Sequence, residues 1–189
     1  MKNLPFRRSA AAASALAFAG FLAQAQTSPF DVTTSGSFTA FGTPPADVTV
    51  LIDHTTDTTS PFPFTSLVAT ERVIFTTTPP SVEDGAFSFR DGDGNTMSGT
   101  FSGVLLPTED PAVMTVTGPF SFSGGTGPYV GAAGGGTLDA VITFTTPDQS
   151  GGVSSIAWKG NVSVVPEPGS LALLVVGLAG LAGLRRRST

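Results

Sequence analysis

The chain has 189 residues, with nine basic and fourteen acidic side chains, one histidine and no cysteine. The lack of cysteine excludes thiolate catalysis, structural disulfides, and zinc or iron–sulfur sites held by thiolates. Six of the nine bases lie near the two ends, so residues 26–164 carry three bases against thirteen acids, a net charge of −10. Such a surface repels nucleic acid, which is therefore not expected as a partner.

The first 25 residues have the order of a secretory signal peptide. Residues 2–8 carry three positive charges, Ser9 to Leu22 form an Ala-rich apolar core, and Ala23 and Ala25 form a small-x-small cleavage pattern. We expect signal peptidase to leave Gln26 as the mature N-terminus. The paired arginines also fit twin-arginine export, but the residues after them are small rather than strongly apolar, which favours the general secretory route.

Residues 26–164 have the pattern of one all-β domain, long enough to bury a core without disulfides. Prolines recur at short intervals and exclude long helices, while apolar residues alternate with polar ones at a period of two. Eight strands joined by short turns predict an antiparallel eight-stranded barrel, with a β-sandwich as the alternative. The expected strands are residues 32–42, 47–53, 66–77, 85–90, 96–106, 113–122, 136–146 and 153–164.

The best-marked turn joins the fourth and fifth expected strands. Asp91, Asp93 and Asn95 alternate there with glycines, which predicts a hairpin. The same three residues have the spacing of the first oxygen ligands of a calcium loop. An EF-hand would continue with glycine and glutamate at the sixth and twelfth places, where Thr96 and Ser102 stand instead, so a calcium site is the weaker interpretation.

No other residues form a recognisable catalytic or cofactor-binding pattern. His54 is the only histidine, and with no Gly-x-Ser-x-Gly elbow in the chain we expect it in a loop between the second and third strands. The acid pairs Glu83-Asp84 and Glu109-Asp110 stand in turn-like stretches beside prolines and are expected to be solvated loop charges. The sequence therefore predicts no catalytic residue and no cofactor, and favours a non-enzymatic role.

The segment from Phe120 to Phe144 reads FSFSGGTGPYVGAAGGGTLDAVITF. Its order of strand, Gly-rich turn, aromatic residue and strand resembles allene oxide cyclase and dirigent-like barrels, as does the run from Gly94 to Gly103. Pro128 replaces the basic residue usual before the aromatic, and we expect Tyr129 to plug one end of the core. The resemblance implies an alternative function, a small-ligand binder or a cyclase- or isomerase-like barrel that uses its lumen. No catalytic residue of those enzymes maps onto this chain.

Residues 165–189 contain three parts in a fixed order. Pro166, Glu167 and Pro168 form a rigid, extended triplet, Leu171 to Leu184 are apolar, and a basic cluster follows at Arg185, Arg186 and Arg187. A helix of 14 residues reaches about 21 Å, so it would span a bilayer only with help from its flanks. The arginines are expected to hold the end of the chain on the cytoplasmic side.

This arrangement resembles the PEP-CTERM sorting signal of Gram-negative bacteria. The resemblance implies an exosortase-like processing enzyme as a partner, insertion of the C-terminal helix in the inner membrane before processing, and a link to extracellular polysaccharide. An ordinary C-terminal anchor with a proline-rich stalk is the alternative. We therefore expect an exported protein of the cell envelope or extracellular matrix, with a structural or binding role.

Overall fold

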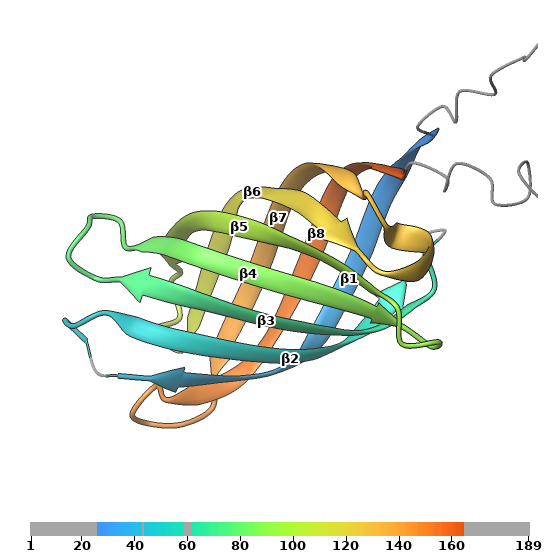
Figure 1. Cartoon of the computed structure of the whole chain (residues 1–189). Helices are drawn as coiled ribbons and strands as arrows, with labels where there is room; N and C mark the ends of the chain where they lie inside the picture. The colour runs from blue at the N-terminus through green and yellow to red at the C-terminus, as the bar shows by residue number, and fades with distance from the viewer. Residues whose placement is uncertain (1–25, 43, 59–61, 165–189) are drawn as a thin grey trace, which may run out of the picture.

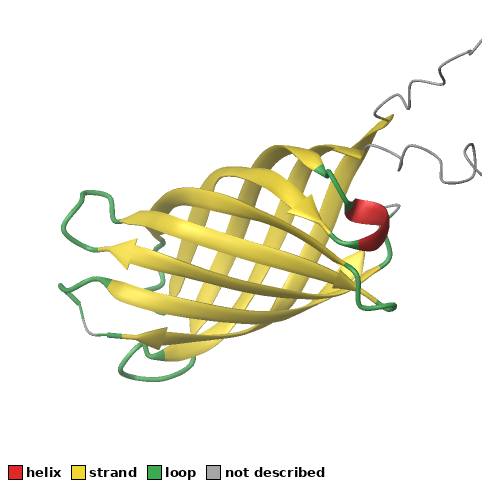
Figure 2. Cartoon of the chain, viewed as in Figure 1, coloured by secondary structure: helices red, strands yellow, loops and turns green. Residues whose placement is uncertain are grey.

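The computed structural model describes residues 26–42, 44–58 and 62–164. Within them the chain forms eight strands and one short 3-10 helix (Figures 1 and 2). The elements are β1 (Gln26–Phe41), β2 (Val48–Thr58), β3 (Phe64–Ile74), β4 (Ser81–Asp91), β5 (Thr96–Pro107), β6 (Val113–Gly125), η1 (Gly127–Tyr129), β7 (Ala133–Phe144) and β8 (Gly151–Val164).

The strands form a closed antiparallel barrel in chain order. Each strand pairs with the next, and β8 pairs with β1 over a long register that includes Val32 opposite Trp158. The predicted barrel and all eight predicted strands are confirmed, and the sandwich alternative is wrong because closure leaves no pair of separate sheets. β1 begins six residues earlier than expected and passes through Pro29. Proline has no backbone N–H to donate. It fits at position 29 because this part of β1 pairs only with β8, and the pairing of β1 with β2 starts later, at Val32.

One half of the barrel interior is filled by aromatic side chains. Trp158, Phe30 and Phe89 are fully buried, and the ring centroids of Phe30 and Phe122 lie 4.9 Å apart in an edge-to-face contact. Each buried aromatic side chain contributes roughly 1.5 to 3 kcal/mol through its burial. The burial of these aromatic side chains therefore contributes substantially to the stability of the barrel.

Tyr129 lies on η1 and closes the aromatic end of the barrel. Its side chain is buried, with its ring centroid 5.2 Å from that of Phe64. The expectation that Tyr129 plugs one end of the core is confirmed. We call this the closed end. It also carries the β2–β3 and β4–β5 connections and the outer ends of β1 and β8 (Figure 1).

A β-bulge interrupts the pairing of β4. Arg72 on β3 pairs with Glu83 while Thr70 pairs with Ala86, so β4 holds an extra residue at this point. Asp84 has a φ of 52°, in the left-handed region, and Glu83 and Asp84 both face outward. The prediction that this acid pair lies in a loop is wrong, because the bulge keeps both residues inside a strand while leaving them solvated. Glu109 and Asp110 do lie in the β5–β6 loop.

Among the described residues, no helix is long and apolar enough to cross a membrane. The predicted signal peptide at 1–25 and the C-terminal segment at 165–189, with its apolar run, lie outside the described residues.

Candidate functional site

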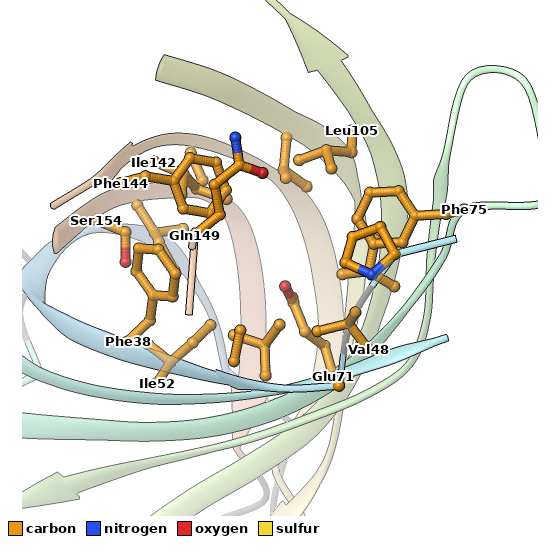
Figure 3. A pocket seen from close by; sticks show the side chains of 18 of the residues that line it. Phe38, Val48, Ile52, Glu71, Phe75, Leu105, Ile142, Phe144, Gln149 and Ser154 are labelled. Atoms are coloured by element: carbon orange, nitrogen blue, oxygen red, sulfur yellow. The ribbon is translucent and has the colours of Figure 1, made fainter. Parts of the chain in front are cut away.

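The end of the barrel opposite Tyr129 contains a pocket of about 70 Å³. We call it the mouth pocket. It opens between the β1–β2 and β7–β8 connections, and the inward faces of seven strands form its wall. A carboxyl group, a hydroxyl and an amide are among the few polar groups in a largely apolar lining (Figure 3). The apolar lining includes Phe38, Val48, Ile52, Phe75, Leu105, Ile142 and Phe144.

Glu71 places the carboxyl group in this pocket. It lies on the inward parity of β3 between Ala69 and Val73, and its side chain points into the ring of apolar residues (Figure 3). The residue is 7% exposed, and no described residue donates a hydrogen bond or forms a salt bridge to its carboxyl group. Burial raises the pKa of Glu71 from its ordinary 4.5 to about 7.

The charged residues that line the mouth pocket are all acidic. They are Glu71, deep in the pocket, and Asp148, on the β7–β8 loop at its rim. Hydrogen bonds from the Ser150 side chain and backbone and from Thr146 lower the pKa of Asp148, which stays ionised. No described lining residue is a lysine, arginine or histidine. The pocket therefore combines an apolar wall with a negative potential.

His54 lies beneath the pocket in a buried polar network, and the prediction that it lies in a loop is wrong. β2 continues to Thr58, and the alternation that buries Ile52 also buries His54. The His54 ring is hydrogen-bonded at Nδ1 to the Thr34 hydroxyl (3.1 Å) and at Nε2 to the Ser154 hydroxyl (2.8 Å). Trp158 Nε1 also donates to Thr34 Oγ1 at 3.4 Å. Burial lowers the pKa of His54, against an opposing effect of the nearby Asp53.

The contact between Ser154 and His54 resembles half of a catalytic triad, since Ser154 also lines the pocket. A hydroxyl on Thr34 stands where a triad needs a carboxylate. Ser154 lies in β8 between two neighbouring strands, opposite Gly36 of β1 and Ile142 of β7. The backbone amides around Ser154 are therefore engaged in the hydrogen-bond ladders of the sheet, and they do not form an oxyanion hole. The network satisfies buried polar groups and does not form an acyl-transfer site.

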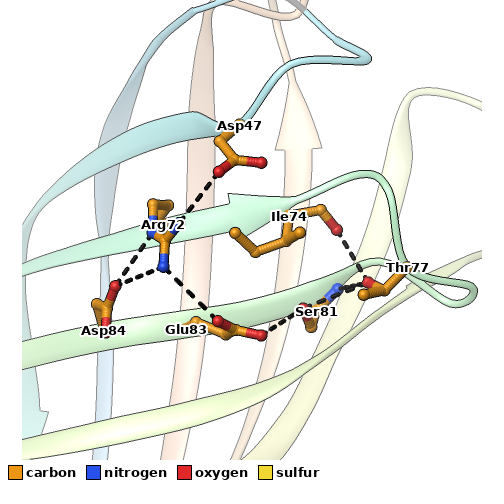
Figure 4. A network of polar contacts seen from close by, with 7 residues as sticks. All are labelled: Asp47, Arg72, Ile74, Thr77, Ser81, Glu83 and Asp84. Carbon is orange, nitrogen blue, oxygen red and sulfur yellow. Dashed lines mark hydrogen bonds and ion pairs between the residues drawn. The ribbon is translucent and has the colours of Figure 1, made fainter.

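Arg72 lies outside the barrel, where it binds three carboxylates (Figure 4). Its guanidinium lies 3.0 Å from Asp47, 3.7 Å from Glu83 and 2.8 Å from Asp84. The hydrogen bonds that the Arg72 guanidinium donates to Asp84 are the first cause that raises the pKa of Arg72. These side chains are between 41% and 73% exposed, so each ion pair adds little stability by itself. Together they connect the β1–β2 loop, β3 and the bulge of β4.

The predicted hairpin between β4 and β5 is confirmed, with a hydrogen bond from the Asp91 amide to Asn95 and a φ of 85° at Gly94. Asp91 accepts hydrogen bonds from the amides of Asp93 (3.0 Å) and Asn95 (2.8 Å) and from the Asn95 side chain. Burial would raise the pKa of Asp91, but these bonds and one from Tyr129 outweigh burial and lower it. Burial and Asp91 raise the pKa of Tyr129 to about 12.

Both carboxylate oxygens of Asp91, the first residue proposed for calcium, are therefore engaged in the turn itself. No cluster of three or more acidic or histidine side chains that could hold a metal occurs among the described residues. The calcium site at Asp91, Asp93 and Asn95 stays a prediction.

The mouth pocket and Glu71 were not predicted from the sequence. A signal was present, because Glu71 has the same parity as Leu67, Ala69 and Val73 in a predicted strand, which places its side chain inside. The other predicted site residues, at the signal cleavage point and in the C-terminal signal, are not brought to this pocket. Apart from Gln26, at the start of β1, they lie outside the described residues.

Comparison with protein families matches residues 164–187 to the PEP-CTERM protein-sorting motif. The chain carries a PEP-CTERM motif. This motif implies export, anchoring of the C-terminus in the membrane, and later cleavage by exosortase. The resemblance inferred from the C-terminal sequence is confirmed.

Among solved structures, the chain is similar to a pterocarpan synthase dirigent protein, with 16% identity and a TM-score of 0.46. The match covers 83% of this chain and 97% of that chain. No curated protein matches the chain.

The PEP-CTERM motif begins at the end of the barrel that is remote from the pocket. β8 starts at Gly151 near the mouth and ends at Val164, which pairs with Gln26 at the closed end (Figure 1). From Ser154 in the pocket to Val164 the strand rises about 3.3 Å per residue, which gives roughly 33 Å along the strand. The pocket and Val164, the first residue of the sorting motif, thus lie at opposite ends of the domain.

Proposed function

We propose that this exported protein is a non-enzymatic binding protein that holds a small, mostly apolar ligand in its mouth pocket. The observation that carries this proposal is the apolar pocket with one buried carboxyl group, Glu71. Ligand sites are usually concave and apolar, with few polar groups that fix orientation. The volume of about 70 Å³, at about 10 to 15 Å³ per water-sized site, accommodates about five to seven heavy atoms.

The proposed maturation has two processing steps. Signal peptidase removes residues 1–25 after Ala23-Gln24-Ala25, so that Gln26 is the first residue of the exported domain at 26–164. An exosortase-like enzyme then reads Pro166-Glu167-Pro168 in the segment 165–189, while Arg185, Arg186 and Arg187 stop its transfer across the inner membrane. The final location is the cell envelope or extracellular matrix, with extracellular polysaccharide as its surroundings. The PEP-CTERM motif supports this sequence of events.

While the C-terminus is anchored, the mouth pocket faces away from the membrane. This orientation follows because the motif starts at the closed end, whereas the pocket opens at the opposite end. A ligand arriving from outside the cell then reaches the pocket without passing the membrane surface.

Binding is tested by filling the pocket. Ala140 is 6% exposed and lines the pocket, so Ala140→Phe places a ring in the ligand space. We expect hexanol, a neutral probe of seven heavy atoms, to raise the melting temperature of the natural protein and to have no effect on Ala140→Phe. The matched control is Ala86→Phe on the outer face of β4, which should respond like the natural protein. An equal response from all three proteins would contradict the proposal.

An enzyme that uses the same pocket is the second candidate. One observation favours it: Glu71 has a pKa of about 7 in an apolar pocket, as a general acid or base requires. A cyclase- or isomerase-like reaction would then depend on this carboxyl group. Glu71→Gln would abolish turnover of such a substrate while its binding persisted, whereas a binding protein shows no turnover in either form.

A further inference from the structure

We propose that the ligand of the mouth pocket is a small amphipathic amine whose ammonium group pairs with the Glu71 carboxylate while its hydrocarbon body packs against the apolar wall. This inference rests on the proposed function and specifies the ligand class of the same pocket. Three observations carry it: the unpartnered carboxyl group, the charges of the lining, and the apolar wall and size of the pocket.

The first observation is the isolation of Glu71. Its side chain is 7% exposed, it points into the pocket, and no described residue supplies a hydrogen bond or an opposite charge. A buried carboxylate is costly unless it is paired and hydrogen-bonded. The nearest base in the sequence, Arg72, is held on the outer face by Asp47 and Asp84 and does not reach it. A cation that enters with the ligand supplies the missing partner.

The second observation is the sign of the surrounding charge. The charged residues in the lining are Glu71 and Asp148, both acidic, and residues 26–164 as a whole carry thirteen acids against three bases. This potential attracts a cation toward the mouth and repels a carboxylate ligand. A neutral alcohol could hydrogen-bond to Glu71, but it would gain nothing from the negative field. The charges therefore favour an amine over both other classes.

The third observation is that the Glu71 carboxyl group is surrounded by a much larger area of apolar side chains. Side chains such as Phe38, Ile52 and Ile142 surround the space above the carboxyl group. A bare ammonium or metal ion would leave this wall exposed to water, whereas an alkyl chain covers it. The pocket has room for about five to seven heavy atoms, so the matching ligand has one amine and a short hydrocarbon body.

The test compares three probes of equal chain length, hexylamine, hexanol and hexanoate, by titration calorimetry at pH 8 on the processed protein. The amine is protonated and Glu71 ionised at this pH. A charge-assisted hydrogen bond is expected to give hexylamine about tenfold or higher affinity relative to hexanol. Hexanoate should bind more weakly than hexanol because of the acidic lining.

Two variants assign the effect to the carboxyl group. Glu71→Gln should abolish the advantage of hexylamine over hexanol, because glutamine keeps a hydrogen-bonding group but carries no charge. Glu109→Gln removes the same charge from the exposed β5–β6 loop and should leave all three affinities unchanged. Circular dichroism of both variants checks that the barrel is folded.

The outcomes separate this inference from the proposed function. Equal binding of hexylamine and hexanol would overturn the amine assignment and leave the apolar binding site intact. Failure of every probe to bind would overturn both. Hexylamine affinity that persists in Glu71→Gln would show that another group holds the amine, and would also overturn the inference.

Discussion

Glu71 and Arg72 are adjacent in β3, yet their charged groups lie on opposite sides of the barrel wall. Glu71 points into the mouth pocket, whereas the Arg72 guanidinium is outside, 3.0 Å from Asp47 and 2.8 Å from Asp84. Successive side chains of a strand face opposite sides of the sheet, so these neighbours cannot form an ion pair. The barrel thus places an unpaired acid inside and a paired base outside.

The unpaired acid makes the stability of the protein depend on pH. The pKa of Glu71 is about 7 in the folded protein and 4.5 ordinarily, so the folded state binds more protons between these values. Stability should be highest below pH 4.5 as far as Glu71 is concerned, fall as pH rises to about 7, and then stay constant. The full difference corresponds to about 3 kcal/mol, from a shift to about 7 at 1.36 kcal/mol per pKa unit.

Glu71→Gln measures this effect. At pH 8 the variant should exceed the natural protein in free energy of unfolding by up to about 3 kcal/mol, and the advantage should vanish near pH 4. Urea titrations across pH 4 to 8 supply the values, with Glu109→Gln as the control for loss of an exposed acid. A constant difference between variant and natural protein over this range would contradict the buried, unpaired state of Glu71.

His54 should produce the opposite dependence on pH. Its pKa lies below the ordinary 6.5 because burial disfavours the charged ring, so the unfolded state binds more protons. Its contribution to stability is complete above pH 6.5 and is lost as pH falls through the lowered pKa. Between pH 4.5 and about 7 the titration of Glu71 changes stability in the opposite direction. The pH dependence due to His54 is therefore measured in the Glu71→Gln protein, where Glu71 does not contribute.

Adding His54→Gln to the Glu71→Gln protein tests this role. Glutamine keeps a hydrogen-bonding side chain near Thr34 and Ser154 but does not titrate. We expect a loss of about 1 to 3 kcal/mol at pH 8, since the buried hydroxyls lose well-placed partners. Below pH 6 the unfolding free energy should change less with pH than in the parent. An unchanged slope would mean that His54 does not titrate on unfolding.

The bulge at Asp84 gives a prediction about backbone conformation. Its φ of 52° lies in a region that Asn tolerates and a β-branched residue does not. Asp84→Asn and Asp84→Val both remove the negative charge that pairs with Arg72, so the loss of the ion pair is common to both and their difference reports mainly on the backbone. We expect Asp84→Val to be less stable than Asp84→Asn by about 1 to 2 kcal/mol in urea denaturation. Equal stability would show that the bulge relaxes at no cost.

Sequence periodicity was sufficient to predict the eight strands because inward apolar residues alternate so regularly. Where the alternation included polar residues, the prediction failed. Thr and Asp residues follow His54 and do not continue the apolar alternation, so periodicity predicts that the second strand ends at Asp53, although β2 continues to Thr58. The bulge shifted the parity of β4 between Val82 and Gly85, so an acid pair that looked like a turn belongs to a strand.

The mouth pocket was harder to predict than the fold. The parity of Glu71 follows from its strand, but the absence of a partner depends on where Arg72 and the loops lie in three dimensions. The contact of His54 with Ser154 joins residues that are 100 positions apart and depends on the closure of β8 onto β1. Neither relationship is encoded in local spacing. The sorting motif, by contrast, is a contiguous pattern and was found from sequence alone.

The proposed orientation on the membrane can be measured because the chain has no cysteine. Asp93→Cys labels the β4–β5 turn at the closed end, and Glu109→Cys labels the β5–β6 loop at the mouth end. The twelve residues of β5 between these turns span about 40 Å at about 3.3 Å per residue. In vesicles containing the unprocessed protein, energy transfer to an acceptor lipid should be stronger from position 93. Equal or reversed transfer would contradict a pocket that faces away from the membrane.

The sorting motif itself is tested by replacing Pro166-Glu167-Pro168 with three alanines. If the segment is only a stalk, the apolar run from Leu171 to Leu184 and the arginines still anchor the chain, and sorting should be unchanged. If an exosortase-like enzyme reads the triplet, the substitution removes both the rigid extended backbone and the only acidic side chain in residues 165–189. We expect the variant to accumulate in the inner membrane with residues 171–189 attached.

Mass spectrometry of the membrane and exported fractions distinguishes these results. The natural protein should lack the C-terminal segment in its final location, and the variant should retain it. Pro107→Ala is the control for the loss of a proline outside the motif, because Pro107 is the last residue of β5 in the barrel domain. This variant should be processed like the natural protein. Glu167→Gln separates the charge from the backbone, since it keeps both prolines. Normal processing of the triple-alanine variant would show that the triplet is not what the enzyme recognises and would leave the ordinary-anchor alternative in its place.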